Sequence, residues 1–175
     1  SAAQLAVFQP EPFSACLMER INCEKPEILI AAATTTGRTL LPYVAGKLRT
    51  GLTADCTKLD IEPESGFLLQ TRPAAGGNIM ATIKTPDCRP QMATVRPHAQ
   101  KPAPLKPGHL GTIERWNPPE ELLQSRTRRV AFTPSAEERG VQDADLVISA
   151  GRGIKKADNL SLVRQLASLL GAAVG

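Results

Sequence analysis

Apolar side chains recur every three to four residues over residues 12–24, and this spacing predicts a helix with one apolar face. The residues on that face are Phe13, Cys16, Leu17 and Ile21. Pro26 then ends the helix, and residues 27–33 form a short apolar run after Glu27. Such an unbroken run is typical of a strand buried on both faces of a parallel sheet.

A second helix is predicted over about residues 38–48, after the hydroxyls and glycine of residues 34–37, which suit a helix N-terminus. Pro42 falls near its first turn, where a missing N–H costs little. Gly51 ends this helix, and residues 52–56 return as a strand. The result is one βαβ unit, whose crossover is right-handed almost without exception.

After Cys56 the pattern changes to short alternating segments separated by turn residues, which predicts an antiparallel meander added to the edge of the parallel sheet. Its predicted strands cover residues 58–62, 67–71, 79–84 and 91–95. Residues 96–109 are proline-rich and are predicted to be an extended connector. Two further strands are predicted at 111–116 and 128–133.

Residues 145–149 form another buried-type strand, followed by a glycine loop and a helix opened by Asp158 or Asn159. One face of that helix carries Leu162, Leu166, Leu169 and Leu170, and Gly171 suits its end. The fold class predicted is α/β, Rossmann-like and three-layered, with a mainly parallel sheet and an antiparallel extension. The predicted domains are residues 1–140 and the strand–helix piece 141–175.

Composition narrows the possible functions. The 175 residues are 42% hydrophobic but only 3% aromatic, and the net charge is +4. Stacking of bases needs aromatic rings beside the positive charge, so nucleic-acid binding is disfavoured. The four cysteines form no CxxC pair, which argues against a zinc site or a disulfide framework. No apolar run approaches the ~20 residues that cross a bilayer, so membrane insertion is not expected.

Two loops follow predicted strands and could hold a ligand. Gly151-Arg152-Gly153 lies between a strand and a helix, where α/β folds bind cofactors, but Lys156 stands where a dinucleotide fingerprint has its third glycine. Taken alone, such a pattern is more often a tight turn. The loop at residues 34–38 could bind an anion such as AMP or ATP, although helix capping alone explains its hydroxyls. The Thr34–Arg38 loop is therefore the basis of an alternative function, a free-standing nucleotide-binding module.

Four segments, in order, resemble the α subunit of electron transfer flavoproteins: residues 50–56, 70–83, 89–97 and 143–153. The resemblance covers nearly the whole chain. It implies that the chain starts after the first strands of the family's N-terminal domain and stops just inside its FAD domain, so that it is a fragment. The family commonly has glycine where this chain has Ala150, and an aromatic residue where it has Ala75.

The resemblance also implies a site and partners. Arg152 would contact the isoalloxazine of FAD in the full-length protein, with Ser149, Gly151 and Gly153 as backbone positions, whereas the 175 residues alone are not expected to hold FAD. The implied role is an electron carrier in fatty acid β-oxidation, rather than an enzyme that converts a substrate. It would pair with a β subunit and pass electrons from acyl-CoA-type dehydrogenases to a quinone oxidoreductase. Bacterial cytoplasm is the expected compartment, ahead of the mitochondrial matrix.

Overall fold

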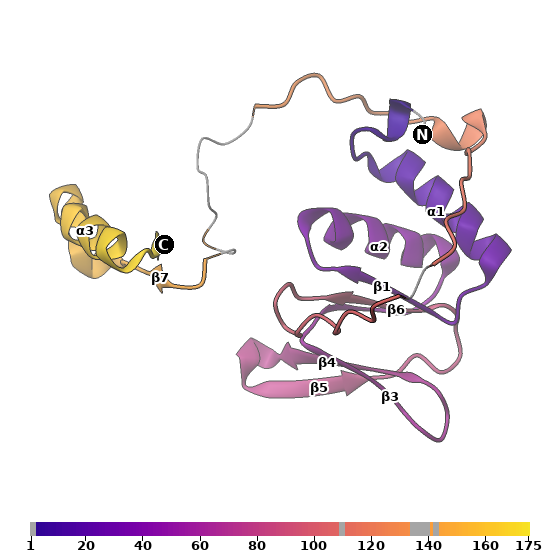
Figure 1. Ribbon diagram of the computed structural model, residues 1–175, viewed down its shortest axis with the longest axis horizontal. Helices are drawn as coiled ribbons and strands as arrows, with labels where there is room; N and C mark the ends of the chain where they lie inside the picture. The colour runs from indigo at the N-terminus through magenta and orange to yellow at the C-terminus, as the bar shows by residue number, and fades with distance from the viewer. Residues whose placement is uncertain (1–2, 109–110, 134–140, 142–143) are drawn as a thin grey trace. The chain divides into compact units, whose positions relative to one another are not determined.

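The computed structural model describes residues 3–108, 111–133, 141 and 144–175. The chain forms two compact units, Ser1–Arg128 and Arg129–Gly175 (Figure 1). The predicted domain boundary between residues 140 and 141 falls beside residues 134–140, which lie outside the described set, and it stays a prediction.

The first unit is built on a parallel sheet of three strands in the order β1-β6-β2. These are β1 (Ile28–Ala32), β2 (Leu52–Cys56) and β6 (Gln91–Val95). Two helices, α1 (Pro10–Glu24) and α2 (Thr35–Leu48), lie over one face of this sheet (Figure 1). The core between them contains Ile21, Leu41, Val44, Ala45 and Met92, of which Val44 and Met92 are fully buried.

A second, antiparallel sheet lies on the opposite face of the parallel sheet (Figure 1). It consists of β3 (Lys58–Ile61), β4 (Leu68–Ala74) and β5 (Ile79–Ile83) in that order. Cys56, Leu68 and Ala93 form a small buried cluster with side chains from both sheets. The mixed α/β fold class predicted from the sequence is thus confirmed. The predicted attachment of the antiparallel strands to the edge of the parallel sheet is wrong, since they form a separate sheet.

The structure corrects the placement of three elements within this fold. Gln91–Val95 is not the last strand of the meander but the central parallel strand, and four of its five residues are buried. β1 is an edge strand rather than a strand buried on both faces, since Ile30 is 54% exposed. Helix α2 begins at Thr35, so Pro42 lies inside it and removes the hydrogen bond to the carbonyl of Arg38.

The chain after β6 returns to α1. Neither predicted strand at 111–116 or 128–133 forms; the described element here is the 3₁₀ turn η3 (Glu120–Leu123). Trp116 lies beside Arg20, with the guanidinium 5.6 Å from the ring centre. The backbone N–H of Arg126 donates to Glu11 Oε2 at 2.7 Å. Residues 116–126 therefore pack back along α1 instead of forming sheet.

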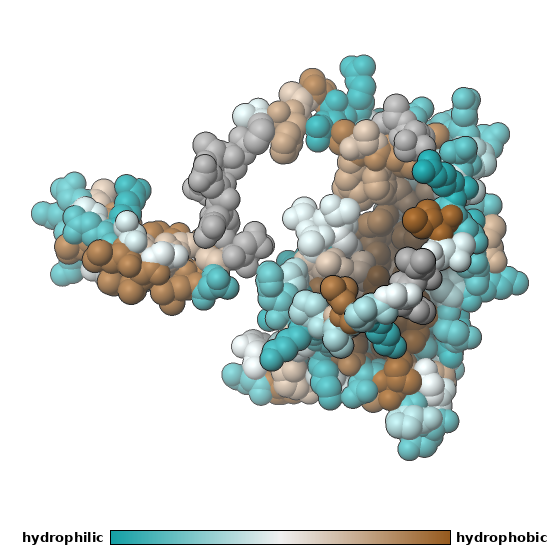
Figure 2. All heavy atoms as spheres, viewed as in Figure 1, coloured by the Kyte–Doolittle hydropathy of each residue, from teal (hydrophilic) through white to brown (hydrophobic). Residues whose placement is uncertain are grey.

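The second unit contains two short parallel strands, β7 (Val147–Ile148) and β8 (Ala173–Val174), and helix α3 (Leu160–Leu170). Ala167 is the buried residue of α3, at 3% exposure. The leucines predicted to share one face are all exposed by 49–84%: Leu162, Leu166, Leu169 and Leu170. Figure 2 shows apolar residues gathered along one side of this unit. Among the described residues of the second unit, none covers the leucine face of α3.

Candidate functional site

The glycine loop predicted from the sequence lies directly after β7. Gly151 precedes a 3₁₀ turn, η5 (Arg152–Ile154), closed by the N–H of Ile154 donating to the carbonyl of Gly151 at 3.1 Å. A second turn, η6 (Ala157–Asn159), leads into α3. The amide Nδ2 of Asn159 donates to the carbonyl of Ile154 at 2.8 Å, so Asn159 ties the helix start to the loop instead of capping α3 with its side chain.

The four predicted site residues lie within five positions at the carboxyl end of β7, and all four are exposed: Ser149, Gly151, Arg152 and Gly153. A Cβ added at Gly151 or Gly153 would meet nothing within 4 Å. The glycines are therefore not required by packing inside this unit, and they leave the backbone open to a ligand. An exposed guanidinium beside open backbone is chemically compatible with a flat ring such as a flavin, whose reduced forms carry negative charge.

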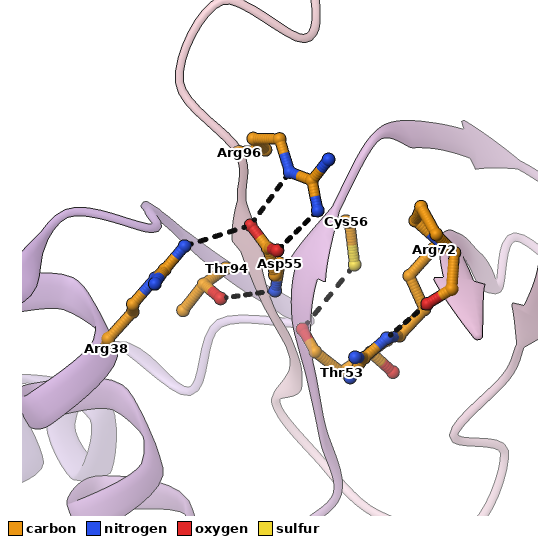
Figure 3. Close-up of polar contacts among 8 residues, drawn as sticks. Arg38, Thr53, Asp55, Cys56, Arg72, Thr94 and Arg96 are labelled. Carbon is orange, nitrogen blue, oxygen red and sulfur yellow. Dashed lines mark hydrogen bonds and ion pairs between the residues drawn. The ribbon is translucent and has the colours of Figure 1, made fainter. Parts of the chain in front are cut away.

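A second cluster joins residues that the sequence analysis did not combine. Figure 3 shows the Asp55 carboxylate at the end of β2 between the guanidinium groups of Arg38 and Arg96. Arg96 binds it with two nitrogens, Nε at 3.2 Å from Oδ1 and Nη2 at 2.7 Å from Oδ2. Arg38 lies in the first turns of α2, and its Nη2 is 3.4 Å from Oδ1 of the same carboxylate. The buried hydroxyl of Thr94 accepts a hydrogen bond from the backbone N–H of Asp55 at 2.9 Å.

The electrostatics of this cluster stabilise the ionised carboxylate. The hydrogen bonds from Arg96, aided by the charges of Arg96 and Arg38, hold the pKa of Asp55 below its usual value. The same carboxylate raises the pKa of Arg96. Next to it, burial raises the pKa of the Cys56 thiol, which stays protonated and hydrogen-bonds to the carbonyl of Thr53. A paired carboxylate and a neutral thiol do not form a catalytic pair, so the cluster holds α2, β2 and the segment after β6 together.

The polar groups of the loop at residues 34–38 contact one another and neighbouring residues of the fold. The hydroxyl of Thr34 accepts a hydrogen bond from the N–H of Gly37 at 3.2 Å, which confirms the predicted cap of α2. A Cβ at Gly37 would lie 1.9 Å from the carbonyl oxygen of Ala32, so the turn requires glycine for close packing. Arg38 is engaged by Asp55. The groups that an AMP or ATP site would need therefore already serve the fold.

The residues that the structure describes contain no group of three or more His, Cys, Asp or Glu side chains placed to hold a metal ion. Among the helices of the described part of the chain, none is both long and apolar enough to cross a membrane.

Two family models match this chain. The electron transfer flavoprotein domain matches residues 1–121, the parallel and antiparallel sheets with their helices. The chain belongs to the electron transfer flavoprotein family. The electron transfer flavoprotein FAD-binding domain matches residues 140–175, which include β7, the glycine loop and α3. The resemblance that the four sequence segments predicted is thereby confirmed.

Curated relatives agree with this assignment. The chain is 42% identical to the electron transfer flavoprotein subunit alpha of Thermoanaerobacterium thermosaccharolyticum over 98% of its own length and 52% of the relative. Identity to the subunit alpha of Clostridium acetobutylicum is 39%, over 97% and 52% of the two chains. The protein FixB of Bradyrhizobium diazoefficiens is 41% identical over 98% and 47%. The chain spans about half the length of the curated relatives it matches.

Proposed function

We propose that this chain supplies the N-terminal domain and the first part of the FAD-binding domain of an electron-transfer flavoprotein α subunit. In the complete protein, FAD carries electrons from acyl-CoA-type dehydrogenases to a quinone oxidoreductase, with a β subunit as the permanent partner. The protein is an electron carrier and converts no substrate of its own. It works in the bacterial cytoplasm.

The observation that carries this proposal is the position of Arg152. It lies exposed on the turn after β7, within the 36 residues matched by the FAD-binding family model. Ligands of open α/β sheets bind at the carboxyl ends of the strands, which is where this turn lies. Ser149, Gly151 and Gly153 provide the backbone around it without a Cβ at either glycine.

FAD supplies the redox chemistry when it is bound, and Arg152 supplies a fixed positive charge next to it. A guanidinium keeps its proton at any working pH and so takes no part in proton transfer. A unit charge at ~4 Å contributes up to about 4 kcal/mol at an effective dielectric near 20. Screening reduces this to about 1–3 kcal/mol, which raises a one-electron potential by roughly 40–130 mV.

The test replaces Arg152 in the native polypeptide containing this chain, purified with its β subunit. Arg152→Ala is expected to lower the first flavin reduction potential by tens of millivolts. Arg152→Lys is expected to lower it less, because lysine keeps the positive charge but lacks the planar guanidinium. Arg164→Ala is the matched control: it removes an exposed arginine of the same unit that lies on α3. An unchanged potential in Arg152→Ala would make Arg152 a turn residue only.

The electron donor needs a separate measurement, because relatives named electron transfer flavoprotein subunit alpha and relatives named FixB match the chain at similar identity, 42% and 41%. Reduction of the flavin by an acyl-CoA dehydrogenase with its substrate supports the donor proposed here. Reduction by other dehydrogenases alone would assign the protein to a different electron pathway while leaving its carrier role intact.

A further inference from the structure

We infer that Asn159 is a positioning residue for Arg152, because its side chain holds the turn from which that guanidinium extends. The inference rests on the proposed role of Arg152 beside the flavin. Asn159 stands at the start of α3, where its side chain makes no capping hydrogen bond to the helix. The amide is engaged by the preceding turn instead, so it has a task that helix formation does not explain.

The turn after Arg152 contains a strained residue. Lys155 has a φ of 60° and a ψ of −44°. Across it, the N–H of Lys156 donates to the carbonyl of Ile154 at 2.7 Å. This geometry is close to that of the γ-turn with positive φ, a rare and strained form. A backbone in such a conformation persists only where surrounding contacts hold it.

Two further hydrogen bonds hold this γ-turn. The N–H of Lys155 donates to the carbonyl of Arg152 at 3.2 Å, which joins the strained residue directly to the backbone of Arg152. The amide Nδ2 of Asn159 donates to the carbonyl of Ile154 at 2.8 Å, so this carbonyl accepts two hydrogen bonds. Among the described side chains, no other hydrogen-bonds to the backbone of residues 151–156.

Packing gives the same loop little support. Arg152 and Lys155 are exposed, and a Cβ added at Gly151 or Gly153 would meet nothing within 4 Å. The conformation of the loop therefore depends on its hydrogen bonds. Without the amide of Asn159, the strained backbone at Lys155 is free to relax, and Arg152 moves with it.

The place of the guanidinium matters because Coulomb energy varies inversely with distance. A charge that moves from about 4 Å to about 8 Å from the flavin ring keeps only half of its effect. Loss of the Asn159 amide therefore weakens the influence of Arg152 without removing its charge. Asn159 acts through Arg152 and needs no contact with the flavin.

Redox titration of the native α polypeptide, purified with FAD and its β subunit, tests this dependence. Asn159→Ser removes the amide donor and keeps a residue that starts helices equally well. It is expected to lower the first flavin reduction potential by at least half of the drop that Arg152→Ala produces. Ser161→Ala is the matched control, since it removes another exposed hydrogen bond at the same helix start, from Ser161 Oγ to the carbonyl of Asp158 at 2.7 Å. Its potential is expected to stay at the unsubstituted value.

The double substitution separates positioning from direct contact. In the Arg152→Ala protein, Asn159→Ser is expected to have less than a fifth of its effect in the unsubstituted protein, because no guanidinium remains to be displaced. A full effect there would mean that Asn159 acts on the flavin itself, and would overturn the inference. An unchanged potential in Arg152→Ala would refute the proposed role of Arg152. A drop in Arg152→Ala without one in Asn159→Ser would refute the positioning alone.

Hydrogen exchange of the same proteins reports on the loop without any electron transfer. The amides of Lys155 and Lys156 are expected to exchange at least threefold faster in Asn159→Ser and at unchanged rates in Ser161→Ala. The amides in the last turns of α3 should keep their rates in both. Loss of FAD, or of protection throughout α3, in Asn159→Ser would make Asn159 a residue of the fold and would overturn the inference.

Discussion

Asp55 combines an uncommon backbone conformation with three polar contacts. Its φ of 60° places it in the left-handed region, which aspartate and asparagine tolerate better than other non-glycine residues. This conformation turns the end of β2 so that the carboxylate meets Arg38 and Arg96. Motif similarity included Asp55 and Arg96, but only in separate segments. Their meeting depends on neighbouring parallel strands ending at the same edge, which local patterns do not specify.

Asp55→Asn tests the charge without disturbing the turn. The free energy of unfolding at pH 7 is expected to fall by about 1 kcal/mol, a modest value because both arginines are largely solvated. The Asp55 pKa is lowered in the folded chain, so its stabilisation is complete above the ordinary value of ~3.9 and is lost as the pH falls through the folded pKa.

Urea unfolding of both proteins between pH 7 and pH 3 measures this effect. The difference between them should shrink toward the acid end, as the pH approaches the lowered pKa of the wild-type carboxyl. A difference that stays constant with pH would show that the amide disturbs the turn rather than the ion pairs.

At the scale of elements, periodicity located most helices and strands but not their neighbours. The helical spacing before Pro26 predicted α1, and the glycine and hydroxyls around Gly37 predicted the start of α2. The segment 91–95 was recognised as a strand, yet its place at the centre of the parallel sheet was missed. A five-residue run has the same appearance in either sheet, and only long-range pairing with β1 and β2 distinguishes them. The leucine spacing of α3 likewise gave the helix but not the exposure of its leucines.

That exposure gives a prediction for α3. Ala167, 3% exposed, holds the helix against its short strands, so Ala167→Leu is expected to destabilise the second unit by about 1–3 kcal/mol through overpacking. Leu169 is 84% exposed, so Leu169→Gln should change stability by less than about 0.5 kcal/mol. Hydrogen exchange of the α3 amides reports on this unit separately. A larger loss in Leu169→Gln would mean that the leucine face is covered in solution.

At the scale of the whole molecule, cofactor retention depends on how completely a site encloses its ligand. Cofactor sites bury most of the ligand surface, whereas the loop from Ser149 to Gly153 is exposed apart from the partly buried Ala150. The Gly-Arg-Gly pattern could be located from the sequence because the motif is local. Contacts that residues elsewhere in the sequence would make with a ligand could not be predicted in this way, because a five-residue segment does not specify them.

The 175-residue chain alone is therefore expected to be colourless after purification. Denaturing it should release no flavin, as measured by absorbance and fluorescence against a protein standard, because one exposed arginine and two open glycines give too few contacts. Addition of FAD should leave its melting temperature unchanged. Stoichiometric release of FAD would contradict the expectation and would mean that these residues enclose the cofactor by themselves.

The contact between Arg126 and Glu11 brings together two positions separated by more than one hundred residues. The polypeptide thus leaves the first unit beside α1. Exposed loop tips inside a packed unit are the places where proteins best tolerate an insertion. The turn between β4 and β5, where Gly76 has a φ of 75° and is exposed, is such a tip in the first unit.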